Sequence, residues 1–115
     1  LPEHQKLVIY AIALLTLKGG RYKKLTDDDE NYLFSGEIYS KYAAIANSLN
    51  KEAKSSRWYR KYIADLDMQG LITTYESGKG IRGHTKLIKL SYSPERIKET
   101  VEKSIMKESE AEGKQ

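Results

Sequence analysis

The sequence contains no cysteine and only two histidines, His4 and His84. Without cysteine there is no disulfide framework, no thiol nucleophile and no zinc site that needs thiolates. Two histidines far apart in the chain also argue against a histidine-based catalytic metal site. The lack of cysteine and the abundance of lysine and glutamate predict an intracellular protein.

Long apolar runs are also missing. The longest stretch, Leu7 to Leu17, covers 11 residues and includes Tyr10 and Thr16. A membrane-spanning helix needs about 20 apolar residues. The acidic Glu3 before the stretch and the sequence Lys-Gly-Gly-Arg after it do not fit a signal peptide. We therefore expect no membrane association.

The chain has 115 residues, enough for one domain, and 39% of them are hydrophobic, enough for one core. Charged residues make up 31%, and 20 basic minus 16 acidic residues give a net charge of +4. This mild basic bias permits a nucleic-acid partner without requiring one. Because the first residue is Leu1, we expect the chain to be a piece of a longer protein.

Helical and extended segments follow one another, with proline, glycine or serine at their boundaries. Pro2 suits the first turn of a helix, and Gly19-Gly20 supplies its stop. Ser35 is predicted to cap a second helix, and Ser55 or Ser56 a third. The remaining expected segments are a polar loop over 21–31, a short strand over 32–34, a third-helix end near Gln69, strands over 71–76 and 86–92 around a hairpin tip at 77–85, and a last helix from Ser93.

The apolar residues within these segments indicate how they pack. The first helix is apolar almost all round, which predicts a central helix that also docks against something outside the chain. The other helices have single stripes: Ile38, Tyr42, Ile45, Ala46 and Leu49 in the second; Tyr59, Tyr62, Ile63, Leu66 and Met68 in the third; Ile97, Val101 and Ile105 in the last. In the second long strand, Ile88, Leu90 and Tyr92 are predicted to share one face.

This order of elements predicts an α+β, mainly α fold. It is a winged helix-turn-helix with a three-helix core, a β-hairpin wing and an extra C-terminal helix. We expect the domain to cover residues 1–105, followed by a polar, disordered tail over 106–115.

Two sequence patterns resemble ligand sites but lack the necessary context. Residues 78–83 match G-x-G-x-x-G, and 78–85 nearly match a phosphate-binding loop. Both motifs need a helix immediately afterwards, whereas a strand is expected here. The acidic run Asp27 to Glu30 lacks the alternating ligands and central glycine of a calcium loop. No trio of serine, histidine and aspartate carries a nucleophile signature, so we predict neither catalysis nor a cofactor or metal site in these residues.

Positive charge is concentrated in one part of the chain. From Lys51 to Lys86 there are eight basic and four acidic residues, a net +4 that equals the charge of the whole chain. The third helix presents Ser56, Arg57, Arg60 and Lys61 opposite its apolar stripe. The hairpin from 77 to 89 holds Lys79, Arg82, Lys86 and Lys89 and no acidic residue. Charges on a helix face are often merely solvated, but basic residues at a glycine-rich tip favour contact with phosphates or the minor groove.

Trp58 allows two interpretations. It borders the apolar stripe of the third helix and could cover Tyr62 one turn further on, the commoner fate of a large aromatic side chain. Alternatively, its ring could lie against a sugar at the edge of a DNA duplex. The sequence leaves both open, with the core placement favoured.

Several segments, in this order, resemble one known family. They are Leu1-Pro2-Glu3-His4, Gly36-Glu37-Ile38-Tyr39, the run from Asp65 to Ile72, and Lys79-Gly80-x-x-Gly83-x-Thr85-Lys86. Together they resemble the C-terminal winged helix of the archaeal replication initiators related to the origin recognition complex and the cell-division-cycle loader. The similarity covers roughly residues 1–100.

The resemblance implies the DNA-binding end of a longer AAA+ ATPase, whose ATP and Mg²⁺ chemistry belongs to a preceding part. It implies double-stranded origin DNA as the partner, with the recognition helix in the major groove and the wing in the minor groove. By position, the contacts would be Ser56, Arg57, Arg60 and Lys61 in the helix, and Lys79, Arg82, His84 and Lys86 in the wing. The first helix would face the ATPase part, and other initiator or helicase-loading proteins are further possible partners. The implied location is cytoplasmic, at the nucleoid.

The chain departs from the family pattern at four positions. The pattern has arginine near Ile81, an aromatic residue near Arg82, arginine near His84 and a second arginine at Trp58. Two other functions also remain open for this fold. One is a transcription regulator that dimerises through its last helix, and the other is a winged helix that binds only proteins.

Overall fold

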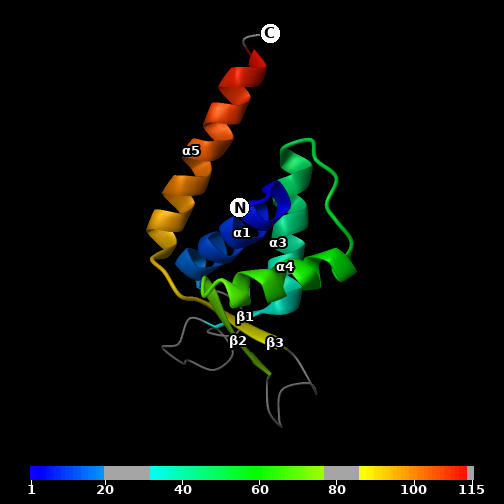
Figure 1. Cartoon of the computed structure of the whole chain (residues 1–115), viewed down its shortest axis with the longest axis vertical. Coiled ribbons are helices and arrows are strands. Elements are labelled where there is room, and N and C mark those ends of the chain that lie inside the picture. Colours follow the sequence, from blue (N-terminus) through cyan, green and yellow to red (C-terminus); the bar gives the residue numbers. More distant parts are fainter. Residues whose placement is uncertain (20–31, 77–85, 114–115) are drawn as a thin grey trace.

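A computed structural model of the chain describes residues 1–19, 32–76 and 86–113. These residues form a small helical body with a three-stranded antiparallel sheet at one end (Figure 1). The helices are α1 (Glu3–Lys18), α3 (Ser35–Ser48), α4 (Ser56–Met68) and α5 (Pro94–Gly113). The strands are β1 (Leu33–Phe34), β2 (Ile72–Glu76) and β3 (Lys86–Leu90). The predicted winged helix-turn-helix is confirmed. The polar loop over 21–31 and the hairpin tip over 77–85 lie outside the described residues.

Helix α1 is the centre of the core, as its all-round apolar sequence predicts. Its buried residues include Leu7, Val8, Ile9 and Ile12, each at most 2% exposed. Helices α3, α4 and α5 pack around it, so most of its apolar surface is covered within the chain. The exposed large hydrophobic residues at its two ends are Leu1 and Leu17. Packing inside the domain thus explains the apolarity that suggested an outside partner, and a contact with an ATPase part stays a prediction.

The two helices of the helix-turn-helix begin differently. Ser55 precedes α4, and its side-chain oxygen accepts a hydrogen bond from the backbone N–H of Trp58 at 3.4 Å, which confirms one of the two predicted caps. The prediction that Ser35 caps α3 is wrong. Phe34 occupies the cap position, and Ser35 is the first helical residue. The reason is that strand β1 runs directly into α3, and Ser35 instead bonds to α4.

The sheet has the order β1-β3-β2, with β3 in the middle. Leu33, Ile72, Ile88 and Leu90 lie on the face toward the helices and are buried. The strand ends at Leu90, two residues earlier than predicted, and Tyr92 is 56% exposed. The period-two pattern of β3 therefore stops where the chain turns into α5, which removes Tyr92 from the predicted core face.

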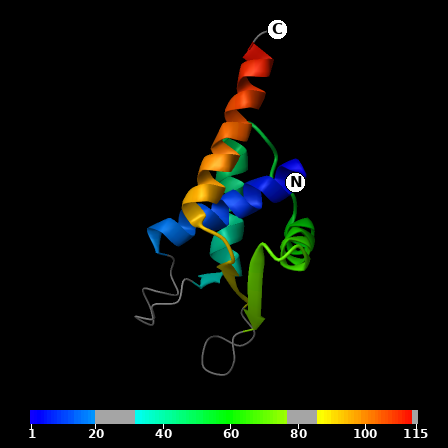
Figure 2. The same cartoon turned by 60° about the vertical axis from the view of Figure 1, so that its left-hand side comes forward.

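Helix α5 crosses α1 and then extends away from the body (Figures 1 and 2). Val101 is buried and Ile97 and Ile105 pack against the core, as the predicted stripe requires. The helix continues to Gly113, beyond the end near Ile105 that the sequence suggested. Lysine, glutamate and alanine are good helix formers, which accounts for the extension. The division into a domain over 1–105 and a tail stays a prediction. Among the described helices, none is long and apolar enough to span a membrane.

Candidate nucleic-acid interface

Helix α4 has one buried and one exposed face. Tyr59, Ile63 and Leu66 turn into the core and are at most 3% exposed. We call the opposite side the outer face of α4; it carries Ser56, Arg57, Arg60 and Lys61, all exposed. Met68 was predicted to complete the buried stripe, but it is 88% exposed. It lies 11 residues after Arg57, which is close to three helical turns, and therefore points outward with the basic residues.

The cations of the outer face have no acidic partners in the described part of the chain. No described carboxylate lies within 4.0 Å of the charged groups of Arg57, Arg60 or Lys61. The Nε of Arg60 donates to the backbone oxygen of Ser56 at 3.3 Å, a contact within the helix. The outer face thus leaves its positive charge available to an external anion.

The acidic residues near the end of α4 are used inside the domain. Asp65 accepts a hydrogen bond from the side-chain amide of Gln5 on α1 at 3.0 Å. Asp67 accepts one from the hydroxyl of Thr74 on β2 at 3.0 Å. These contacts fix the C-terminal end of α4 to the central helix and to the base of the wing.

Tyrosine hydroxyls hold the N-terminal end of α4. The Tyr59 hydroxyl donates to the backbone oxygen of Ser35 on α3 at 2.9 Å, and its oxygen lies 3.2 Å from the Ser35 hydroxyl. Burial raises the pKa of Tyr59 to about 12, so the group stays a neutral donor. This buried hydroxyl therefore links α4 to the start of α3.

The turn before α4 is held in the same way. The Tyr39 hydroxyl donates to the backbone oxygen of Lys54 at 2.9 Å, and the Lys54 N–H donates to the Tyr42 oxygen at 2.8 Å. Asn50 adopts a left-handed backbone, with φ of 58°, where this turn begins. The contact of Tyr39 was not predicted from the sequence. The available signal was a second tyrosine on the helix, three residues before Tyr42.

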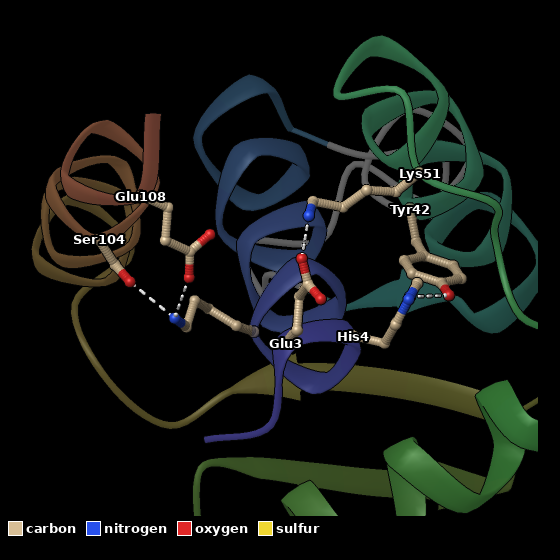
Figure 3. A network of polar contacts seen from close by, with 7 residues as sticks. Glu3, His4, Tyr42, Lys51, Ser104 and Glu108 are labelled. Atoms are coloured by element: carbon tan, nitrogen blue, oxygen red, sulfur yellow. Dashed lines mark hydrogen bonds and ion pairs between the residues drawn. The ribbon is translucent and has the colours of Figure 1, made fainter. Parts of the chain in front are cut away.

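Figure 3 shows how α1 is linked to its surroundings. His4 lies 2.8 Å from the Tyr42 hydroxyl through its Nδ1, and Glu3 forms an ion pair with Lys51 in the turn. On the other side, Lys6 donates to Ser104 on α5 at 2.6 Å and lies 3.7 Å from Glu108. Burial lowers the pKa of His4, and the positive charges of Lys54 and Lys51 act in the same direction. A neutral ring lets Nδ1 accept the Tyr42 hydroxyl hydrogen.

The predicted wing contacts are only partly visible. Lys86 is exposed and begins β3, directly opposite Glu76 at the end of β2. Lys79, Arg82 and His84 fall in the tip over 77–85, outside the described residues. The base of the hairpin lies beside α4, since α4 and β2 are in contact and both views show them adjacent (Figures 1 and 2). The outer face of α4 and Lys86 thus belong to adjacent elements of the fold, the helix and the hairpin; their role in binding stays a prediction.

Trp58 is 49% exposed and does not belong to the core, contrary to the favoured interpretation. Its ring lies 6.3 Å from that of Tyr62, and the Lys61 ammonium lies 5.0 Å from its centre. It leans on Tyr62 as expected, but about half of it stays exposed. No group of three or more metal-ligating side chains occurs among the residues that could be searched, and the run from Asp27 to Glu30 lies outside them.

A three-helix core, a strand that runs into the helix-turn-helix and a hairpin beside its second helix define a winged helix-turn-helix domain. The family described as "CDC6, C terminal winged helix domain" matches residues 1–100. The chain belongs to this family.

Individual relatives agree with this assignment. The chain is 35% identical to an ORC1-type DNA replication protein of Thermococcus kodakarensis over 98 residues, 85% of this chain and 21% of that protein. It is 38% identical to ORC1-type DNA replication protein 2 of Sulfurisphaera tokodaii over 88 residues, 76% of this chain and 19% of that protein. The chain thus spans about a fifth of the length of these relatives.

Solved structures show the same fold. Cdc6p from Pyrobaculum aerophilum superimposes with a TM-score of 0.67 at 21% identity, over 94% of this chain and 24% of that chain. The Orc1 protein of Aeropyrum pernix, solved in complex with DNA, gives a TM-score of 0.64 at 26% identity, over 90% of this chain and 24% of that chain.

Proposed function

We propose that this domain binds duplex DNA at replication origins, with α4 in the major groove and the wing in the minor groove. It would act as the C-terminal part of an ATP-dependent initiator of the nucleoid. The ATP and Mg²⁺ chemistry of such a protein would belong to residues outside this chain, and no catalytic role is assigned to the domain itself.

The observation that carries the proposal is the outer face of α4, where Arg57, Arg60 and Lys61 are exposed without acidic partners among the described residues. In a helix-turn-helix, the second helix enters the major groove with its N-terminal residues near the bases. The three cations all lie in the N-terminal half of α4. Arginine can donate two hydrogen bonds to the paired acceptors of guanine, and all three cations can bind phosphates.

The relatives support the same function. The matching proteins of Thermococcus and Sulfurisphaera are named as DNA replication proteins, and the related Orc1 protein was solved with DNA bound. The wing residues Lys79, Arg82, His84 and Lys86 would reach the minor groove or its phosphates.

Fluorescence anisotropy with labelled duplexes tests the proposal. If about five phosphates are neutralised, the logarithm of the association constant falls with the logarithm of salt concentration at a slope of about −4 to −5. Arg82→Ala with Lys86→Ala should weaken binding to origin-like and scrambled duplexes alike, because phosphate contacts carry no sequence information. Arg57→Ala or Arg60→Ala should also reduce the preference for origin-like sequence.

A matched control is Lys103→Ala on α5, where the lysine pairs with Glu99 at 3.1 Å away from the proposed interface. This variant removes one positive charge and should leave affinity almost unchanged. Absent or salt-independent binding by the wild-type chain would contradict the proposal and favour a role in protein binding.

A further inference from the structure

Trp58 is the one tryptophan of the chain and lies between Arg57 and Lys61 in the first turn of α4. Large aromatic side chains usually bury most of their surface, and burial of the whole ring would stabilise the fold. Half of this side chain is nevertheless exposed, next to the cations of the proposed interface. Its position therefore suggests a role in binding.

The ring is held in place by a row of other rings. Trp58 leans on Tyr62 at 6.3 Å and 31°, and Tyr62 is nearly parallel to His4 at 6.5 Å and 12°. His4 is in turn bonded to the buried Tyr42. These rings lead from the surface into the core. We therefore expect the indole to be held in place before binding, so that it loses little conformational freedom when it binds.

The side chains of Trp58 and Lys61 offer hydrogen-bond donors and no hydrogen-bond acceptor. The indole N–H is a donor only, and in the described part of the chain it has no partner. The Lys61 ammonium lies 5.0 Å from the ring centre, and it too has no carboxylate partner among the described residues. A neutral donor beside an ammonium matches an anionic oxygen.

The direction of the ring distinguishes a phosphate from a base. Trp58 lies on the flank of α4 that carries Tyr62, which stacks on His4 of α1, whereas Arg57 lies on the side opposite the buried stripe. The Lys61 ammonium lies over the Trp58 ring and so reaches the same flank. When a helix lies in the major groove, its outermost residues meet the bases and its flanks meet the sugar-phosphate walls.

We propose that Trp58 and Lys61 together hold one backbone phosphate, with the indole N–H and the ammonium donating to its oxygens and the ring lying against the adjoining sugar. Trp58 is then a positioning residue that sets the register of α4 in the groove. The inference rests on the proposed function.

The test combines the native fluorescence of Trp58 with Trp58→Phe, which keeps a ring and removes the N–H. Binding of duplex should shift the wild-type emission and protect it from quenching by acrylamide. Trp58→Phe should lower affinity about three- to tenfold, the net size of one typical hydrogen bond, equally for origin-like and scrambled duplexes. The salt dependence should be unchanged for Trp58→Phe and about one unit shallower for Lys61→Met.

A neutral methylphosphonate at each position of the duplex in turn locates the contact. Methylphosphonate at one position should weaken wild-type binding and have a smaller effect on Trp58→Phe, which keeps only the Lys61 contact to that phosphate. The control Tyr92→Phe, an exposed aromatic change between β3 and α5, should behave as wild type. Equal binding by Trp58→Phe and wild type, or a loss of affinity confined to the origin-like duplex, overturns this inference but leaves the proposed function in place. No binding by the wild-type chain overturns the proposed function and the inference with it.

Discussion

Two regions of this domain carry basic residues in different surroundings. On the outer face of α4, Arg57, Arg60 and Lys61 have no carboxylate partner in the described structure. We call the other region the α1–α5 seam. It consists of α5 and the side of α1 that faces it, where Lys6 pairs with Glu108, Lys98 with Glu102 at 3.0 Å and Lys103 with Glu99 at 3.1 Å.

The two regions differ in whether their positive charges pair with carboxylates inside the domain. In the seam, Tyr10 also donates to Glu102 at 2.7 Å, so polar contacts accompany the packing of Val101 on α1. Exposed ion pairs of this kind contribute little to stability, but they neutralise the surface around them. The cations of α4 have no carboxylate partner among the described residues, and the proposed function assigns them to DNA phosphates and bases.

The largest effect is expected from removing the three positive charges of the outer face of α4, compared with removing three from the α1–α5 seam. Arg57→Ala, Arg60→Ala and Lys61→Ala together should reduce duplex affinity about a hundredfold or more and make the salt slope about 2.7 units shallower. Lys6→Ala, Lys98→Ala and Lys103→Ala change the net charge equally and should alter affinity far less. Anisotropy titrations at several salt concentrations measure both, and equal losses would mean that only net charge matters.

A smaller effect is expected for the seam itself. Burial and the neighbouring Glu102 raise the pKa of Tyr10 to about 12, so its hydroxyl remains protonated and donates to that carboxylate. Tyr10→Phe should lower the free energy of unfolding by about 1 kcal/mol, the net value of such a hydrogen bond. Urea denaturation measures this loss. DNA affinity should not change; a loss of affinity would show that the two regions are coupled.

The smallest effect concerns pH. The folded pKa of His4 lies below its ordinary value of 6.5, because burial disfavours the charged ring. Below pH 6.5 the unfolded chain therefore binds the proton first, so the free energy of unfolding falls as the pH decreases through this range. The fall ends below the folded pKa. Urea midpoints measured from neutral to mildly acidic pH should show this slope.

Matched variants assign the slope to one residue. His4→Gln should flatten it, and His84→Gln, which alters the second histidine, should leave it in place. An unchanged slope in His4→Gln would remove His4 as the cause.

Local patterns predicted most of the fold. The spacing of Tyr59, Ile63 and Leu66, with Ser55 before them, gave the correct start and buried face of α4. Two predictions about single residues were wrong. Ser35 does not cap α3, because β1 runs directly into that helix, and Met68 is exposed at the end of α4 rather than buried. The predicted recognition-helix residues are exposed together as expected, whereas three of the four predicted wing residues lie outside the described structure.

The sequence by itself determined the order of elements, the central position of α1 and the concentration of positive charge between Lys51 and Lys86. These features depend on short-range periodicity, capping and composition, which can be read along the chain. Only the tertiary structure decided that Lys6 of α1 meets Ser104 and Glu108 of α5, since these residues lie far apart in the sequence. It also decided that Trp58 stays half exposed on a row of rings from two helices. Such contacts depend on how distant segments pack, and no local pattern encodes them.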